Sequence, residues 1–177
     1  MKKLFVVLGV VLCSATLTAC VSFAQKTPEA EVLNHYVGTW KSEAVFKPSK
    51  GLPEGWEGVG TVDAKWILDG NLHQMEIIFS DLVQKLVIQR YNQKTNRYER
   101  WEIDSWGDSS YWLGSYNEEA KSMTWEYAVP GLGLSGTMVH QFSEGKAITV
   151  RMLMEDVHGN VLADGVIESR RPEQPAE

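Results

Sequence analysis

Cysteine is nearly absent from this chain of 177 residues. Cys13 and Cys20 are the two cysteines, so no cysteine follows residue 20. The rest of the chain therefore has no thiol for a disulfide, a cysteine-ligated zinc site or nucleophilic catalysis. It also lacks an apolar run of the roughly 20 residues that a transmembrane helix needs.

Long runs of basic residues are absent as well. The chain has 17 Lys and Arg against 23 Asp and Glu, and its net charge is −6 at neutral pH. A protein that follows a nucleic-acid backbone needs a basic surface, so we expect no nucleic-acid partner. With 44% hydrophobic residues, the composition describes one soluble domain that is large enough to bury its own core.

The start of the chain has the pattern of an export signal. Lys2 and Lys3 precede an apolar run over residues 4–12, and this order matches the charged and hydrophobic regions of a signal peptide. The run is too short to span a bilayer as a permanent helix. We therefore expect residues 1–19 to be a cleaved signal peptide.

Two interpretations of the cleavage site stay open. Leu17-Thr18-Ala19-Cys20 resembles a lipobox, in which Cys20 becomes the lipidated first residue and residues 20–27 form a linker. The resemblance implies that a lipid anchor is the protein's one contact with a membrane. Val21 does not match the Asp of inner-membrane retention, which implies the periplasmic side of the bacterial outer membrane. The alternative is cleavage after Ala24, which would give a periplasmic or secreted protein.

A short helix is expected at the start of the folded domain. Thr27 is a suitable N-cap, Pro28 fits the first helical position, and Glu29 places a negative charge in the first turn. The helical pattern ends near Tyr36, and after Val37 the chain has the character of strands.

The remaining chain consists of runs rich in Val, Ile, Thr and aromatic residues, which favour strands. Turn residues such as Asp69-Gly70 and Glu144-Gly145 separate these runs. The connections are too short for crossovers, so each strand should pair antiparallel with the next. The predicted strands cover 38–47, 57–68, 71–80, 83–92, 97–105, 109–117, 122–129, 135–143, 146–156 and 160–170.

A meander of this width removes its own edges when it closes into a barrel. The alternation of side chains agrees: Trp101 and Ile103 share one face of their strand, and Arg100 and Glu102 share the other. The sequence therefore predicts an all-β fold, a roughly ten-stranded antiparallel barrel over 28–171, with a polar tail at 172–177.

Several short motifs carry a resemblance to a known family. Gly38-Thr39-Trp40 resembles the G-x-W signature of lipocalin-like (calycin) barrels. Together with Asp69-Gly70, the segment 101–107 and Gly114-Ser115-Tyr116, it is similar to the bacterial DUF1579 family over most of 33–171. The resemblance implies a calycin-type barrel in which Gly38 and Trp40 close one end. It implies no catalytic residues, because that family has no established activity.

Histidine placement gives no support for a metal or a haem. The four histidines lie in four different predicted elements and lack the spacing of zinc ligands. Ten-stranded haem barrels similar to nitrobindin use a histidine near the C-terminus, whereas His158 of this chain lies in a predicted turn beside Gly159. We expect no cofactor and no metal.

Aromatic residues and methionines are the unusual part of the composition, with seven Trp and six Met. Such side chains suit a small, largely apolar ligand, because indoles give large contact areas and Met adapts its shape. They suit a packed core equally well, and both interpretations stay open. The candidate ligand-contacting tryptophans are Trp101, Trp112 and Trp125.

Three polar residues complete the candidate site. His140 alternates with Met138 and Phe142, which places it on an apolar face. Asp104 could serve as a general acid or base. Arg151 would need a carboxylate partner if its face pointed inward, and the candidate partners are Glu76, Asp104 and Glu126.

One further pattern is a G-x-G-x-x-G match at residues 131–136. A dinucleotide site requires a helix after these glycines, but here they precede a predicted strand. We interpret them as a loop at the rim of the barrel.

The sequence favours an exported barrel that binds an unknown small, largely apolar ligand and is not an enzyme. One alternative is a barrel enzyme of the isomerase, hydratase or cyclase type that uses Asp104 or His140. Another is an envelope interaction protein whose barrel is filled by its own side chains. An interior void large enough for a ligand would favour the binding protein or the enzyme over the interaction protein with a filled barrel.

Overall fold

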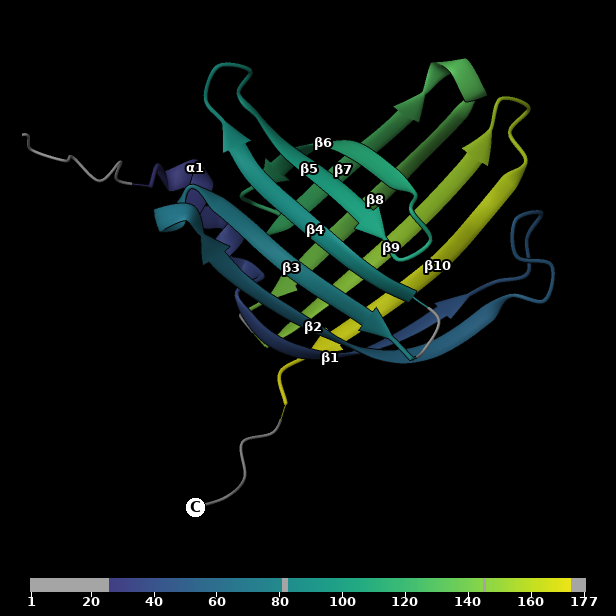
Figure 1. Cartoon of the computed structure of the whole chain (residues 1–177), viewed down its shortest axis with the longest axis horizontal. Helices are drawn as coiled ribbons and strands as arrows, with labels where there is room; N and C mark the ends of the chain where they lie inside the picture. Colours follow the sequence, from purple (N-terminus) through teal and green to yellow (C-terminus); the bar gives the residue numbers. More distant parts are fainter. Residues whose placement is uncertain (1–25, 81–82, 145, 173–177) are drawn as a thin grey trace, which may run out of the picture.

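The computed structural model describes residues 26–80, 83–144 and 146–172. Its strands are β1 (Gly38–Phe46), β2 (Trp56–Ile67), β3 (Leu72–Phe79), β4 (Val83–Asn92), β5 (Arg97–Asp104), β6 (Ser109–Asn117), β7 (Ser122–Val129), β8 (Leu134–Ser143), β9 (Ala147–Asp156) and β10 (Val161–Arg170). Each strand pairs antiparallel with the next, and β1 pairs with β10 to close the barrel (Figure 1). The predicted all-β barrel of ten antiparallel strands is confirmed.

Parts of the sequence-based account lie outside the described residues. The signal peptide, the lipidation site at Cys20 and the end of the polar tail all belong to these parts. Within the described ranges, every helix is too short to cross a membrane.

The strand boundaries follow the turn residues of the sequence. All ten strands begin and end within one residue of the predicted limits. Asp69 and Asn96 adopt positive φ angles of 55° and 53° in two of the turns. Asp and Asn tolerate this conformation better than most residues, so local chemistry ends the strands there.

A short helical segment closes one end of the barrel. Helix α1 (Pro28–Glu31) is capped by the Thr27 hydroxyl, which accepts a hydrogen bond from the Ala30 amide at 3.3 Å. The 3₁₀ helix η1 (Val32–His35) follows it, so the second half of the expected helix is wound more tightly than an α-helix. Leu33 and Tyr36 are completely buried, and this segment acts as a plug.

Trp40 fixes the plug to the barrel wall. Its indole Nε1–H donates to the Tyr36 carbonyl at 2.7 Å, and the Arg171 guanidinium lies 3.8 Å from the centre of its ring. Gly38 has a φ of +114°, and a Cβ there would lie 1.9 Å from the Arg171 guanidinium. Gly38 is therefore required both for its backbone conformation and for the approach of Arg171.

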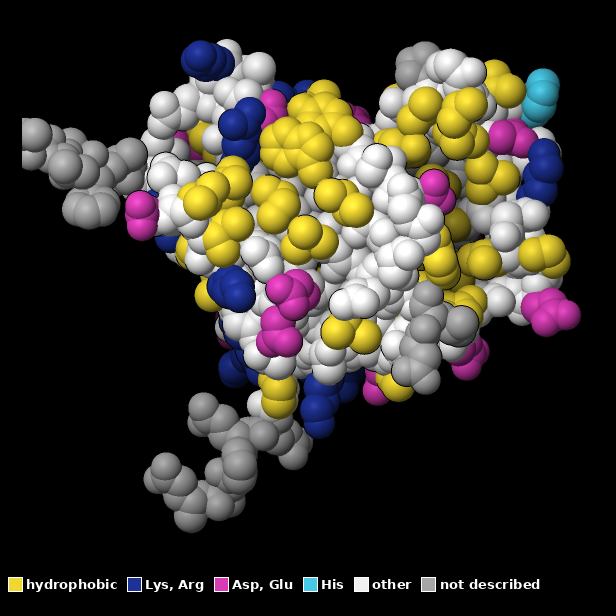
Figure 2. Space-filling view, in the orientation of Figure 1, with side chains coloured by type: hydrophobic (Ala, Val, Ile, Leu, Met, Phe, Trp, Pro, Cys, Tyr) yellow, Lys and Arg dark blue, Asp and Glu magenta, His cyan; other side chains and the backbone are white. Residues whose placement is uncertain are grey.

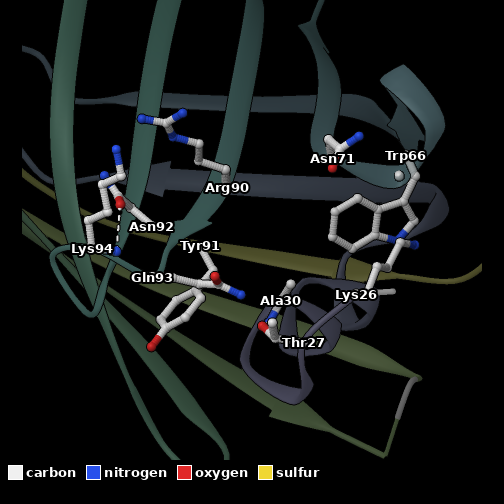
Figure 3. Close-up of a pocket in the computed structure, with 11 residues that line it drawn as sticks. Lys26, Thr27, Ala30, Trp66, Asn71, Arg90, Tyr91, Asn92, Gln93 and Lys94 are labelled. Carbon is white, nitrogen blue, oxygen red and sulfur yellow. Dashed lines mark hydrogen bonds between the residues drawn. The ribbon is translucent and has the colours of Figure 1, made fainter. Parts of the chain in front are cut away.

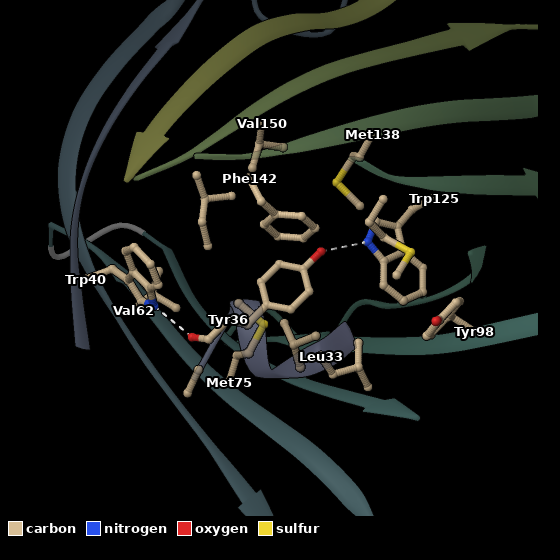
Figure 4. Packing of buried hydrophobic residues seen from close by; sticks show 14 of the residues in the cluster. Leu33, Tyr36, Trp40, Val62, Met75, Tyr98, Trp125, Met138, Phe142 and Val150 are labelled. Carbon is tan, nitrogen blue, oxygen red and sulfur yellow. Dashed lines mark hydrogen bonds between the residues drawn. The ribbon is translucent and has the colours of Figure 1, made fainter. Parts of the chain in front are cut away.

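The interior of the barrel is filled mainly by apolar side chains. The strands alternate between inward and outward positions, so that His140 of β8 points inward between Met138 and Phe142. Figure 4 shows how these side chains surround Tyr36. The buried apolar cluster consists of Leu33, Tyr36, Trp40, Val62, Ala64, Met75, Val87, Tyr98, Trp112, Met123, Trp125, Met138, Phe142, Ile148 and Val150.

The opposite end of the barrel is less well covered. The inward-facing side chains of Ile77, Tyr127, Met152 and Ile167 are only partly buried, although they pack against the core. They extend from the interior, where Ile77 and Ile167 contribute to the wall of a cavity, toward this end. We call these four residues the mouth. The barrel therefore has one plugged end and one accessible end.

Hydrophobic side chains also gather on the outer surface of β3 to β6. Figure 2 shows this face, where apolar side chains lie close to one another between charged ones. The exposed members include Ile78, Leu86, Ile103, Tyr111 and Leu113.

Candidate functional site

An interior cavity lies between the plug and the mouth. Its volume is about 70 Å³, a little more than the liquid volume of two water molecules. The apolar part of its wall includes Val62, Met75, Met138, Ile148 and Val150, together with Trp40, Phe79, and Ile77 and Ile167 of the mouth. Sites for drug-sized ligands usually exceed about 300 Å³. The Trp and Met side chains thus fill most of the barrel and leave a small void.

A buried chain of hydrogen bonds reaches this cavity from β7. The indole Nε1–H of Trp125 donates to the Tyr36 hydroxyl at 3.4 Å (Figure 4). That hydroxyl lies 3.0 Å from Nδ1 of His140. Because Tyr36 accepts from the indole, its own proton is available for Nδ1 of His140. Neutral His140 then carries its proton on Nε2. Burial lowers the pKa of His140 well below its usual value, and the Arg100 charge lowers it further, so the ring is neutral.

Arg100 of β5 brings a positive charge to the cavity wall. Its Nε lies 2.6 Å from Oε1 of Glu102, while Nζ of Lys85 lies 3.3 Å from Oε2 of the same carboxylate. Burial alone would raise the pKa of Glu102, but Arg100 and Lys85 hold it below its usual value. Glu102 is therefore ionised. Nη1 of Arg100 is buried and has no hydrogen-bond partner among the described residues.

A second polar pair lies beside the plug. His73 and Gln89 face each other across β3 and β4, and both side chains are completely buried. Their side-chain nitrogens and oxygen have no partner in normal hydrogen-bond geometry within the described part of the chain. The His73 ring contacts Trp66 edge to face, with 5.4 Å between ring centres. Burial lowers the pKa of His73 to about 4, so this ring is also neutral.

Three of the candidate site residues point into the barrel. Trp112, Trp125 and His140 are buried on the inner face, and His140 lines the cavity. Trp125 reaches the cavity through Tyr36. The indole of Trp112 donates to the Ser110 hydroxyl at 2.8 Å and packs on Tyr127 of the mouth, with 4.9 Å between ring centres.

Two other candidates, Trp101 and Arg151, lie on the outer surface and not beside the interior cavity. Arg151 is exposed because its neighbours Val150 and Met152 take the inward positions of β9. Trp101 faces outward because Arg100 faces inward, and it packs against Tyr111 with 5.4 Å between ring centres. Neither residue lines the cavity of the described structure.

Asp104 belongs to a turn. Its Oδ1 accepts hydrogen bonds from the backbone amides of Trp106 and Asp108, both at 3.0 Å. The carboxylate thus stabilises the β5–β6 connection at the mouth end, away from His140. The structure does not bring the two predicted acid–base candidates together.

The inward-facing arginine is Arg100, which the sequence-based search for a site missed. The signal was present, since Arg100 and Glu102 are two residues apart on one face of a strand and can pair there. No comparable signal marked Tyr36. It followed a predicted helix, and its contact with His140 joins residues 104 positions apart in the chain.

A larger depression lies on the surface near the start of the described chain (Figure 3). It measures about 410 Å³ and is lined in part by Lys26, Trp66 and Arg90. The ammonium of Lys26 lies 3.7 Å from the centre of the Trp66 ring, and Arg90 pairs with Glu99 at 2.6 Å. Because these cations already have partners, the interior cavity is the better candidate site.

The remaining motifs carry no site. The glycine-rich segment forms the 3₁₀ helix η3 (Pro130–Leu132) and enters β8, so its interpretation as an inter-strand connection is confirmed. In the described ranges, no three His, Asp or Glu side chains gather in a way that could hold a metal ion.

Comparison with known proteins identifies the fold. No family model and no curated protein matches the chain. The crystal structure of Rv2717c from M. tuberculosis matches with a TM-score of 0.65 and 12% identity, over 84% of this chain and 100% of that one. The S-type phycobiliprotein lyase CPES from Guillardia theta matches with a TM-score of 0.54 and 10% identity, over 84% of this chain and 95% of that one. At such low identities, these likenesses show a shared barrel fold alone.

Proposed function

We propose that this protein binds a small, largely apolar ligand inside its barrel. The observation that carries the proposal is the cavity of about 70 Å³ behind the partly buried apolar mouth. Protein interiors are close-packed, and voids larger than a water molecule are few. A void in a barrel with one plugged and one accessible end favours binding over a purely structural role.

The size of the cavity limits what can bind. It accommodates a small molecule or one end of a longer molecule, whose remainder would lie against Ile77, Met152 and Ile167 at the mouth. Met75 and Met138 line the cavity, and their unbranched side chains can change shape at low energetic cost. This wall favours apolar ligands with a narrow profile.

An enzymatic role has less support from the site. Asp104 is occupied by two backbone amides, and burial lowers the pKa of His140, which weakens it as a base. One protein with this fold is named a phycobiliprotein lyase. The same fold hosts unrelated functions, so that name does not make this chain a lyase.

Two expectations from the sequence belong to the same proposal. The motifs at 38–40, 69–70, 101–107 and 114–116 support membership of the DUF1579 family, and the N-terminal pattern supports an exported protein with a lipid on Cys20. Labelled palmitate should be incorporated by the wild-type protein and lost in Cys20→Ala. Label that survives this substitution would contradict lipidation at Cys20.

Blocking the mouth tests the binding role. Ile167→Phe adds bulk at a half-buried position that lines the cavity, so it should weaken the binding of octanol by about tenfold or more. Octanol is a neutral probe with a narrow apolar chain, and its binding can be measured by calorimetry. Native mass spectrometry of protein taken from its own envelope would identify a ligand that remains bound.

Ile103→Phe is the matched control, because Ile103 is 49% exposed on the outer face. It should bind octanol as the wild type does. Equal weakening in both variants would show that octanol binds outside the barrel. If neither octanol nor octanoate binds the wild-type protein and no co-purified ligand is found, the proposed function is wrong.

A further inference from the structure

Two buried polar groups in the cavity wall lack hydrogen-bond partners. They are Nη1 of Arg100 and Nε2 of His140, and no described residue bonds to either. Each residue is only 3% exposed, and both line the cavity. A buried polar group without a partner is costly, and native structures usually pair such groups with protein, water or a ligand.

Both groups are hydrogen-bond donors. An arginine guanidinium has donors and no acceptor. His140 is neutral, and its Nδ1 accepts from Tyr36, so its Nε2 carries the proton. The cavity therefore presents two N–H donors within a mainly apolar wall, and the group that satisfies them must be an acceptor.

The charges of the wall favour a negatively charged acceptor. Arg100 and Lys85 share the single carboxylate of Glu102, so these three side chains carry one net positive charge. Asp104 is the next inward-facing acid on β5, but its carboxylate is bound to the turn amides at the barrel rim. Charge-assisted hydrogen bonds from Arg to a carboxylate are about twice as strong as those between neutral groups.

We propose that the cavity holds the carboxylate of a small monocarboxylic acid with an apolar tail. The carboxylate accepts hydrogen bonds from Nη1 of Arg100 and Nε2 of His140, and the tail lies toward Ile77, Met152 and Ile167. The volume of about 70 Å³ suits a carboxylate, which is close in size to two water molecules. This inference rests on the proposed function and names the ligand class for the same site.

Octanoate and octanol provide the test, because they share one chain length and differ in the head group. Calorimetry with the full wild-type chain should show octanoate binding at least about tenfold more tightly than octanol. Equal affinities, or tighter binding of octanol, would overturn the inference while leaving the binding role intact.

A double substitution tests the residues. Arg100→Met combined with Glu102→Met removes both charges, so no carboxylate is left buried beside a missing arginine. This variant should lose most of the preference for octanoate, because Nη1 of Arg100 is gone while Lys85 and Nε2 of His140 remain, and octanol affinity should be unchanged. A preference for octanoate that persists undiminished in the variant would overturn the assignment of Arg100.

The chain provides a matched control on β10. Arg170 and Glu168 are also two residues apart and pair at 2.9 Å, but on the outer face. Arg170→Met with Glu168→Met should keep the full preference for octanoate. Loss of the preference in this control would show that surface charge, rather than the cavity, selects the acid.

One measurement needs no variant. The ¹H–¹⁵N signal of His140 Nε2 in the wild-type protein should shift strongly when octanoate is added and less when octanol is added, because a neutral hydroxyl is a weaker acceptor than a carboxylate. If saturating octanoate leaves this signal in place, the assignment of His140 is wrong. A cavity that holds only water would give this result.

Discussion

Arg100 shows what a buried charge does at the scale of a single residue. Its guanidinium is almost completely buried, and Glu102 neutralises one side of it while Nη1 has no protein partner among the described residues. Removing one member of a buried ion pair leaves the other charge without compensation. Loss of one member of this buried pair should therefore destabilise the folded protein more than loss of one member of an exposed Arg–Glu pair.

Glu102→Gln should destabilise the folded protein strongly. The change keeps the shape of the side chain but leaves Arg100 buried beside a neutral amide, and we expect a loss of about 3–5 kcal/mol in the free energy of unfolding. Urea denaturation monitored by far-UV circular dichroism measures this loss. Glu168→Gln alters the exposed pair on β10 and should change the free energy by less than about 0.5 kcal/mol. Similar losses in the two variants would contradict the buried role of Glu102.

His73 makes stability depend on pH. Its pKa is about 4 in the folded protein and about 6.5 in an unfolded chain. As the pH falls, the unfolded state binds the proton first, so the contribution of His73 is fully present above pH 6.5 and is lost progressively toward pH 4. The loss from this residue amounts to at most about 3 kcal/mol.

A series of urea denaturations between neutral pH and pH 4 measures this contribution. His73→Gln should make the decline in stability over that range shallower, because Gln does not titrate, while buried His140, whose pKa is also lowered, still contributes to it. His158→Gln, which replaces a histidine in an exposed turn between β9 and β10, is the control variant. If stability declines as steeply with falling pH in His73→Gln as in the wild type, the buried His73 ring does not contribute to this pH dependence.

At the scale of elements, the strands were predictable because their signals are local. The turns contain residues that accept positive φ, such as Asp69 and Asn96, and the segments between them alternate in polarity. Thr27 and Pro28 likewise mark the start of α1 in a way that needs no tertiary contact. These local features were sufficient to predict the ten strands and the start of the helix without knowledge of the packing.

The inward face of each strand was not predictable in the same way. Arg100 and Arg151 occupy similar alternating patterns, yet Arg100 points into the barrel and Arg151 points out. Which face turns inward is decided when the barrel closes, and closure depends on contacts between distant residues such as Trp40 and Arg171. The cavity itself joins residues from the plug and from several strands, so local pattern alone could not reveal it.

The plug should contribute substantially to stability. Leu33 of η1 is completely buried, and Leu33→Ala removes most of its side chain from the core, so we expect a loss of about 2–5 kcal/mol in urea denaturation. Leu132→Ala is the control, because Leu132 of η3 is 71% exposed and should cost little. A loss below about 1 kcal/mol for Leu33→Ala would show that the barrel does not depend on its plug.

At the scale of the whole molecule, the two ends of the barrel have different roles. The plugged end is held by Leu33, Tyr36 and Trp40, while the accessible end has side chains that are only partly buried. A packed core with one small void and one accessible end can admit a narrow ligand without opening the sheet. The likeness to Rv2717c shows the barrel fold alone, whereas the proposed carboxylate site depends on Arg100 and His140 of this chain.

A crystal structure of the protein grown with octanoate tests the central claim most directly. The account predicts density for the carboxylate in the cavity, within hydrogen-bond distance of Nη1 of Arg100 and Nε2 of His140, with the tail directed toward Met152 and Ile167. Octanoate bound on the outer surface, or a cavity that holds only water at saturating octanoate, would contradict it.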